Sequence, residues 1–317
     1  MSKIIVTGGS GFIGHNLTQV LCEKHEVINI DVNKPLIHIE GASWVCCDIR
    51  DTKALRKIFE RSTPDYVVHL AARTDLLGHS LDDYDVNTTG TQSVIDAIRS
   101  SSSIKKAVFA SSMLVCKVGY IPSSYQDYCP STVYGESKVM MEGIVRSSSL
   151  STHWTLFRPT SIWGPWFNAP YRDFFDMVRR GKFVGVSGCA TKTYGYVGNT
   201  VYQIAKLLFD ASANSHQKTF YIGDNPPINI NSWASEISGK LGKKDPFVLP
   251  KFVILLAGKF GDLLGCLGIK FPLNSFRYKN LTTDNIIPLD DLYSVVGPPP
   301  FTRSEGIDRT LDWMSNH

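Results

Sequence analysis

The chain has 317 residues, of which 43% are hydrophobic and 20% charged, with a formal net charge of +4. This length exceeds the usual size of one domain, so we expect one large α/β unit or a nucleotide-binding domain with a smaller appendage. The positive charge is small and scattered, which excludes a nucleic-acid surface but is compatible with an anionic small ligand.

Cysteine usage and the first residues point to a reduced environment. The seven cysteines form no C-x-x-C pair, and Ile4–Val6 takes the place of a charged-then-apolar leader. We therefore expect a cytoplasmic protein. Neither the cysteines nor the histidines have metal-ligand spacing, so no metal is predicted.

Short apolar runs alternate with amphipathic stretches through the first half of the chain. Strands are predicted at Lys3–Thr7, Glu26–Asp31, Ser43–Cys46, Tyr66–Leu70, Lys106–Ala110 and Trp154–Arg158. Helices are predicted at Ile13–Glu23, Asp51–Arg61, Tyr84–Ser100, Thr132–Ser148 and, further along, Val197–Phe209. Strands that are apolar throughout lie in a parallel sheet covered on both faces. The fold class predicted is α/β, a doubly wound parallel sheet of the Rossmann type.

After Arg158 the alternation loosens, and glycines, prolines and aromatics become frequent. We expect a Rossmann domain over residues 1–165, with 190–215 packing back on it, and a smaller interleaved substrate-binding region over 166–189 and 216–317. The aromatics from Trp163 to Phe175 are expected to form a packed core. The apolar stretch Lys251–Phe271 is interrupted by Lys259 and Asp262, whereas a membrane span needs about 20 apolar residues. It is predicted to be a packed helix, with a helix on a membrane or partner surface as the alternative.

The segment "KIIVTGGSGFIGHNL" reads as strand, glycine turn and helix. Gly8 allows the tight turn, Gly11 the approach of a pyrophosphate, and Gly14 close packing of the helix on the strand. Asp31 ends the second strand, where a carboxylate would accept hydrogen bonds from the adenosine ribose. This favours NAD over NADP, although Lys34 keeps NADP open.

The segment "STVYGESK" places Tyr134 and Lys138 four residues apart, on one face of a helix. A lysine ammonium near a tyrosine favours the phenolate and lowers the tyrosine pKa toward the range of a general base. Ser112 follows an intervening strand and completes the candidate set.

Together these segments resemble the extended short-chain dehydrogenase/reductase family, in particular its nucleotide-sugar epimerases and dehydratases. The matching segments are "TGGSGFIG", "DI" at Asp48 and Ile49, "HLAA" at His69–Ala72, "NTTGT" at Asn87–Thr91 and "YGESK". The resemblance implies that Tyr134 is the general base, that Lys138 binds the nicotinamide ribose, and that Ser112 holds the reacting oxygen. It implies a cofactor site made of Gly8, Gly11, Phe12, Ile13, Gly14, Asp31, Asp48, Ile49, Leu70, Ala71, Ala72, Tyr134 and Lys138. It also implies a homodimer through the helices at Tyr84–Ser100 and Thr132–Ser148.

The resemblance extends to a nucleotide-diphosphate sugar as the substrate. Lys192 stands where the family has an arginine for the diphosphate, and Arg277 is placed like a later diphosphate arginine. Ser161 replaces a substrate-contacting asparagine, and Arg73 and Thr74 follow "HLAA" at the edge of the predicted site. Asn199 replaces an acid of the family pattern.

The residues after Ser112 are the most discriminating. Related dehydratases have Asp-Glu there, decarboxylating members have Glu at the second position, and 3,5-epimerising members have Cys, whereas this chain has Met113 and Leu114. Neither side chain can transfer a proton. Two activities that need only hydride transfer remain compatible with the sequence: a 4-epimerase, which the NAD preference favours, and a 4-ketoreductase.

Two further hypotheses stay open from the sequence. The departures at Ser161, Asn199 and Cys116 suit a non-catalytic NAD-binding or sensing module, although the Ser112, Tyr134 and Lys138 set weighs against it. A steroid-type dehydrogenase of the same superfamily would use the 251–271 helix on a membrane.

Overall fold

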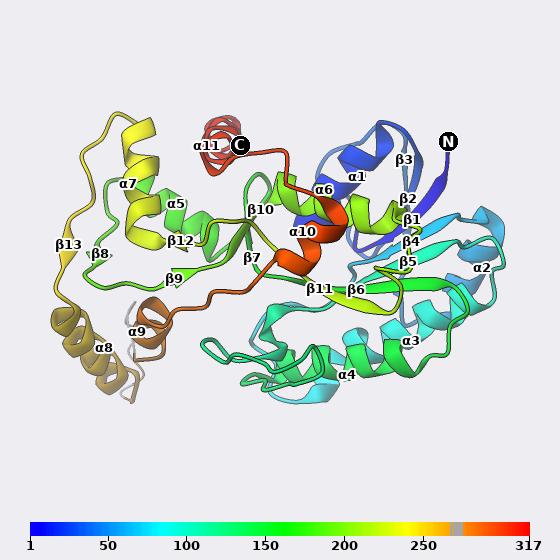
Figure 1. The fold of residues 1–317 in the computed structure, drawn as a ribbon, viewed down its shortest axis with the longest axis horizontal. Coiled ribbons are helices and arrows are strands. Elements are labelled where there is room, and N and C mark those ends of the chain that lie inside the picture. Colours follow the sequence, from blue (N-terminus) through cyan, green and yellow to red (C-terminus); the bar gives the residue numbers. More distant parts are fainter. Residues whose placement is uncertain (267, 269–274) are drawn as a thin grey trace.

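The computed structural model describes residues 1–266, 268 and 275–317. Its central element is a seven-stranded parallel sheet in the order β11-β6-β5-β4-β1-β2-β3 (Figure 1). These strands are β1 (Lys3–Thr7), β2 (Glu26–Asp31), β3 (Ala42–Cys46), β4 (Tyr66–His69), β5 (Lys106–Ala110), β6 (His153–Pro159) and β11 (Lys218–Ile222). The predicted doubly wound Rossmann fold is confirmed.

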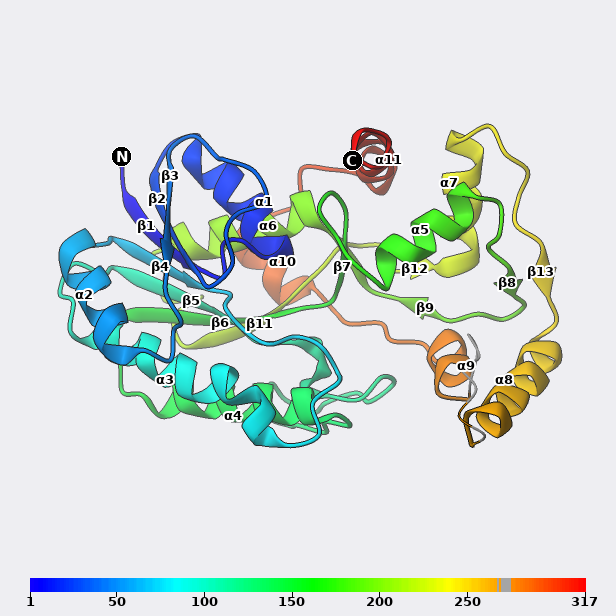
Figure 2. The same ribbon diagram turned by 180° about the vertical axis from the view of Figure 1, so that it is seen from behind.

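Helices cover both faces of the sheet, as seen from the two sides in Figures 1 and 2. One face carries α1 (Phe12–Cys22) and α6 (Val197–Phe209) with α10 (Asp290–Val296), and the other carries α2 (Thr52–Ser62), α3 (Asp85–Arg99) and α4 (Val133–Ser147). Because successive strand residues point to opposite faces, Ile4 and Val6 pack with α1 while Ile5 packs with the α2–α4 layer.

The rest of the chain forms the smaller region that carries α5 (Tyr171–Arg179), α7 (Ile230–Lys240), α8 (Lys251–Cys266), α9 (Ser275–Thr282) and α11 (Arg303–Asn316). Its short strands pair two by two: β7 (Ser161–Trp163) with β10 (Tyr194–Tyr196), β9 (Thr191–Lys192) with β12 (Ile228–Asn229), and β8 (Gly185–Val186) with β13 (Val248–Leu249). Short 3₁₀ turns occur at Leu81–Tyr84 and Met113–Val115.

Aromatic side chains fill the core of this smaller region, as predicted. Trp163, Phe175 and Trp233 are almost completely buried, and their ring centroids lie 5.0–5.6 Å apart. Gly306 of α11 lies against this core, because a Cβ there would sit 2.9 Å from both Trp163 and Tyr196. The last helix therefore packs directly on the tryptophan rings.

Two predictions about the second half of the chain need correction. Residues 218–222 form β11 of the central sheet, so the placement of everything after residue 216 in the substrate region is wrong for this strand. The helix predicted at Lys251–Phe271 forms as α8, but it is not packed on all sides, since Phe252 and Leu256 are 63% and 62% exposed. The predicted end of that helix lies outside the described residues. No helix in the described part of the chain has the length and apolar character to cross a membrane.

Candidate active site

The glycine turn after β1 is closely packed against its neighbours. Gly8 has φ +75°, and a Cβ there would lie 2.6 Å from the backbone nitrogen of Ala71. A Cβ on Gly14 would lie 2.1 Å from the carbonyl oxygen of Gly8. Both positions therefore require glycine. Gly11 caps α1 without a side-chain hydrogen bond, so the N-terminus of this helix presents backbone N–H groups suited to a pyrophosphate.

The carboxylate of Asp31 lies beside this turn at the end of β2. Its Oδ2 accepts a hydrogen bond from the Ser10 N–H (3.0 Å), and its Oδ1 accepts one from the Asn33 N–H (2.9 Å). The carboxyl ends of β1 and β2 thus bring Gly8, Gly14 and Asp31 together. This glycine cradle with an adjacent carboxylate fits a dinucleotide such as NAD.

The remaining predicted cofactor residues follow the carboxyl ends of β3 and β4. Leu70, Ala71 and Ala72 come directly after β4. Ile49 is buried, whereas Asp48 forms an ion pair with Arg50 (2.5 Å) that lowers the pKa of its carboxyl.

Ser112, Tyr134 and Lys138 come together where β5 ends and α4 begins. Ser112 follows β5 and accepts a hydrogen bond from the Leu114 N–H (3.1 Å), while Thr132 caps α4 by accepting from the Gly135 N–H (3.0 Å). Tyr134 and Lys138 occupy one face of α4, and all three side chains are buried. The ammonium of Lys138 donates to the carbonyl of Ala110, the last residue of β5 (3.0 Å).

Burial controls the titration of both helix residues. It raises the pKa of Tyr134 to about 12, although a hydrogen bond with Ser112 acts in the opposite direction. It lowers the pKa of Lys138 to about 8, which the charge of Glu142 partly opposes. The pKa of Tyr134 in this structure is therefore raised, not lowered as the Tyr134–Lys138 spacing predicts, because burial disfavours the phenolate.

Gly135 sets how closely α4 approaches the turn after Ser112. A Cβ on this residue would lie 2.3 Å from the carbonyl oxygen of Leu114. The helix can therefore bring Tyr134 next to Ser112 only with glycine at this position. This glycine lies inside the segment "YGESK", and its packing role cannot be predicted from the local pattern.

A buried ion pair one turn beyond Lys138 was also missed. Arg158 of β6 donates to both carboxylate oxygens of Glu142 (2.7 and 2.9 Å), and neither side chain is exposed. Arg158 also donates to Tyr221 of β11 (3.0 Å) and to the carbonyl of Tyr125 (2.6 Å). This Glu142–Arg158 pair joins α4, β6, β11 and the loop before α4. An acid four residues after Lys138 was the available signal, but nothing local identifies its partner.

The apolar pair after Ser112 forms the 3₁₀ turn at Met113–Val115. Asn285, which follows α9, donates a weak hydrogen bond to the Met113 sulfur (3.9 Å). Cys116 is a buried thiol whose pKa is raised by burial, consistent with the expected packing role.

On the predicted substrate side, the guanidinium of Arg73 is held by the Asp75 carboxylate (2.8 Å) and stacks on the ring of Tyr84 at 5.0 Å. Its backbone is fixed by the buried Asn87, which accepts from the Arg73 N–H (2.9 Å) and donates to the Arg73 carbonyl (3.0 Å). Thr74 is exposed.

Lys192 of β9 donates to the side chain of Asn280 in α9. Burial lowers the pKa of this lysine to about 8, against the raising effect of Asp284. Ser161 is buried and hydrogen-bonds with Tyr171. Arg277 belongs to α9, but its side chain lies outside the described part of the structure.

Asn199 has a structural role. Its amide donates to the Phe301 carbonyl (2.8 Å) and accepts from the Phe301 N–H (2.9 Å), which a carboxylate cannot do. The asparagine that replaces the family's acid therefore connects α6 to the segment before α11.

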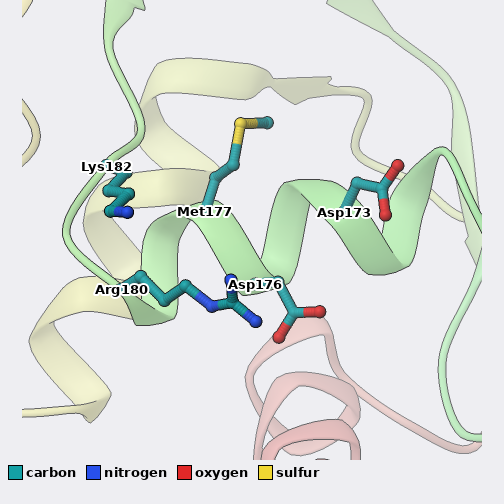
Figure 3. A pocket seen from close by; sticks show the side chains of 5 residues that line it. All are labelled: Asp173, Asp176, Met177, Arg180 and Lys182. Carbon is teal, nitrogen blue, oxygen red and sulfur yellow. The ribbon is translucent and has the colours of Figure 1, made fainter.

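A pocket outside this site lies on α5 and the turn after it (Figure 3). It is lined by Asp173, Asp176, Met177, Arg180 and Lys182. None of these residues belongs to the predicted cofactor or catalytic set.

Residues 4–223 match the model of the NAD dependent epimerase/dehydratase family. An Escherichia coli O157:H7 protein named N-acetyl-alpha-D-glucosaminyl-diphospho-ditrans,octacis-undecaprenol 4-epimerase is 30% identical, over 99% of this chain and 96% of that protein. A 3-beta-hydroxysteroid dehydrogenase of Mycolicibacterium neoaurum is 26% identical, over 78% of this chain and 72% of its own. The UDP-glucose 4-epimerase of Thermotoga maritima, solved with UDP-glucose, superposes with a TM-score of 0.76 over 99% of each chain at 21% identity.

Proposed function

The chain belongs to the NAD dependent epimerase/dehydratase family, and on that premise we propose that it is a 4-epimerase acting on a hexose carried by a diphosphate. The predicted family and its NAD cofactor are confirmed by this membership. The 4-epimerase reaction itself rests on one observation. Ser112, Tyr134 and Lys138 gather in a buried site whose next two residues, Met113 and Leu114, cannot transfer a proton.

In the proposed reaction the same three side chains act in the oxidation of the sugar at C4 and again in its reduction. A bound NAD would supply the hydride acceptor and donor for C4 of the sugar. Tyr134 removes the proton of the C4 hydroxyl, and Ser112 holds the same oxygen by a hydrogen bond. Lys138 orients the cofactor ribose and places positive charge near the phenolate. The resulting 4-keto sugar turns over, and Tyr134 returns the proton after reduction of the opposite face.

One residue of the predicted substrate side and one similar protein support a substrate in which the sugar is linked to a diphosphate. Lys192 is partly desolvated, and its ammonium can meet a phosphate as a point charge. The similar E. coli protein is named for a substrate with a diphosphate-linked N-acetylhexosamine. We therefore propose an N-acetylhexosamine diphosphate ester as the substrate, with Lys192, Ser161 and Arg277 as its contacts.

The test is epimer formation without net cofactor consumption. Purified protein is expected to release NAD(H) on denaturation and to interconvert the gluco and galacto forms of UDP-N-acetylhexosamine or of the undecaprenyl-linked sugar, followed by NMR. Tyr134→Phe should lower kcat by about 10²–10⁴-fold. Tyr202→Phe is the same change on α6, where the hydroxyl donates to the Val296 carbonyl (3.3 Å), and it should leave kcat unchanged.

Other outcomes assign the protein to the competing hypotheses. Stoichiometric oxidation of NADH or NADPH with a 4-keto sugar would establish a ketoreductase. Oxidation of a 3β-hydroxysteroid would establish a steroid dehydrogenase, in line with the similar M. neoaurum enzyme. Retention of NAD with no turnover in any of these assays would favour a binding module.

Two organisational proposals accompany this function. The cofactor domain comprises the predicted residues 1–165 and 190–215 without the short strands β7, β9 and β10, and gains β11 and α10. The smaller region, including these three short strands, binds the substrate. The protein is a homodimer that pairs α3 and α4 of each copy, which sedimentation velocity would test.

A further inference from the structure

The helix α8 carries an apolar stripe on its outward side. Phe252, Leu256, Phe260 and Leu263 are 53–63% exposed. Their spacing of four, four and three residues places them along one side of the helix, over about 16 Å of its axis. The opposite side is buried and consists of Ile254, Gly258 and Gly261. The more hydrophobic face of this helix thus points away from the protein, the reverse of the usual arrangement in a globular domain.

Positive charge is concentrated around the same helix. Residues 243–284 contain seven Lys and Arg and three Asp and Glu, a surplus of four that equals the net charge of the whole chain. Lys251 and Lys259 of α8 and Lys279 of α9 are exposed. An exposed apolar stripe bordered by lysines is typical of helices that lie in the interface of an anionic bilayer.

The position of α8 connects this surface to the proposed site. It packs against α9 at the end of the molecule opposite β2 and β3 (Figures 1 and 2). From α9, Asn280 accepts a hydrogen bond from Lys192. Just after α9, Asn285 accepts a hydrogen bond from the Gly119 N–H (3.2 Å) and donates to Met113, the neighbour of Ser112. A surface bound by α8 would therefore lie next to the residues proposed to hold the diphosphate.

We propose that α8 docks on the surface of an anionic lipid bilayer and that the diphosphate carrier of the sugar is a membrane-embedded polyprenyl chain. This inference rests on the proposed function for the sugar and the reaction. The tail of such a substrate stays in the hydrocarbon, so its diphosphate and sugar stand in the headgroup layer, where only an enzyme held at the surface reaches them. A nucleotide sugar is free in water and requires no such face. The E. coli relative is named for a substrate of this lipid-linked kind.

The first experiment measures docking without any substrate. The full-length protein is sedimented with vesicles of phosphatidylglycerol and phosphatidylcholine, and with vesicles of phosphatidylcholine alone. We expect binding to the anionic vesicles that weakens as salt is raised. The double variant Phe252→Ser/Leu256→Ser should bind about tenfold to hundredfold more weakly, because two large apolar side chains no longer enter the interface.

A matched control removes two exposed apolar side chains elsewhere. Leu36 and Ile37, 68% and 40% exposed, lie in the loop between β2 and β3, far from α8. Leu36→Ser/Ile37→Ser should bind vesicles like the unchanged protein. Unchanged melting temperatures and NAD contents show that both variants are folded.

Two results would overturn the docking surface. One is no binding to anionic vesicles, and the other is equal vesicle binding by Phe252→Ser/Leu256→Ser and the unchanged protein. If that variant also loses self-association in the second case, the stripe is a contact between two copies of this chain.

The second experiment separates the docking proposal from the epimerase proposal. Turnover is measured with undecaprenyl-diphosphate N-acetylglucosamine in anionic vesicles and with UDP-N-acetylglucosamine in solution. We expect Phe252→Ser/Leu256→Ser to lower turnover of the vesicle substrate at least about tenfold and to leave any turnover of the soluble substrate unchanged. Vesicle binding without epimerisation of either sugar refutes the proposed function and keeps the docking surface. Epimerisation of the UDP-sugar alone, without vesicle binding, refutes the lipid carrier and keeps the epimerase.

Discussion

Removing Arg158 should destabilise the protein strongly, because it leaves the Glu142 carboxylate buried without its partner. Both side chains are fully buried, and the two are joined by hydrogen bonds of 2.7 and 2.9 Å. Breaking such a pair costs about 3–5 kcal/mol. Against a total stability of about 5–15 kcal/mol, Arg158→Met should lower the melting temperature by on the order of 10 °C.

The loss should depend on pH in a defined direction. Arg158 helps hold the pKa of Glu142 below its usual value, so the pair stabilises the protein above the unfolded carboxyl pKa and this contribution is lost as pH falls through the lower, folded pKa. In Arg158→Met the buried carboxylate prefers its proton, so the free-energy difference from the unchanged protein should be largest near pH 7 and shrink toward pH 4.5. Urea unfolding followed by circular dichroism at several pH values measures it.

A nearby arginine provides the matched control. Arg146 lies 3.4 Å from the same Glu142 carboxylate, but its side chain is 20% exposed. Arg146→Met should cost less than Arg158→Met, because its contact with Glu142 is longer and partly open to solvent, although its hydrogen bond to the Thr219 hydroxyl (2.6 Å) is lost as well. In Arg158→Met/Glu142→Gln the two losses should not add, since the uncompensated charge is gone. Strict additivity, or a loss that is the same at pH 5 and pH 8, would refute the reasoning.

Three further predictions concern residues around the site. Gly135→Ala should lower kcat by about tenfold to hundredfold, because its Cβ would push Tyr134 away from Ser112, whereas Gly143→Ala in the same helix meets nothing within 4 Å and should leave kcat unchanged; equal kinetics of the two variants would contradict this. Asn199→Asp should cost about 1–3 kcal/mol in urea unfolding, since it removes the donor to the Phe301 carbonyl, and should leave KM unchanged; a KM effect without destabilisation would give Asn199 a role in substrate binding. Lys138→Met should abolish turnover yet gain stability relative to the unchanged protein near pH 7, by up to about 3 kcal/mol. The pKa of Lys138 is about 8 in the folded protein and 10.5 in the unfolded chain, so the folded protein loses this proton at lower pH. The cost of burying the ammonium therefore disappears as pH rises from about 8 toward 10.5. A stability difference between Lys138→Met and the unchanged protein that stays constant over that range would refute this prediction.

Most of the Rossmann fold could be predicted closely because local patterns determine its strands and helices. The strands at Lys3–Thr7, Glu26–Asp31 and Lys106–Ala110 and the helix at Val197–Phe209 have the predicted ends. Strands in a covered parallel sheet are continuous apolar runs, whereas the helices between them repeat their apolar residues with the helical period. Each element can therefore be predicted from its own residues. β11 was missed because its place at the edge of the sheet depends on pairing with β6, more than 50 residues earlier in the chain.

The site shows the same division between local and distant information. The glycine turn, Ser112, Tyr134 and Lys138 are adjacent through strand ends and one helix turn, so spacing predicts their meeting. The Glu142–Arg158 pair depends on two distant segments. For α8, hydrophobicity predicts that Phe252 and Leu256 face inward. In the structure the buried positions of this helix are instead Ile254, Gly258 and Gly261. Two of them are glycines, and the periodicity of large side chains does not detect such a face.

The aromatic core beneath α11 gives the protein an intrinsic optical reporter. Of the six tryptophans, Trp163, Trp166, Trp233 and Trp313 belong to the smaller region, and the rings of Trp166 and Trp313 lie 5.5 Å apart across the contact with α11. Their emission reports mainly on whether this region has closed around Trp163, whereas far-ultraviolet dichroism reports on the helices of the whole chain. Comparing the two signals during refolding would therefore separate assembly of the sheet from docking of the last helix without adding a label.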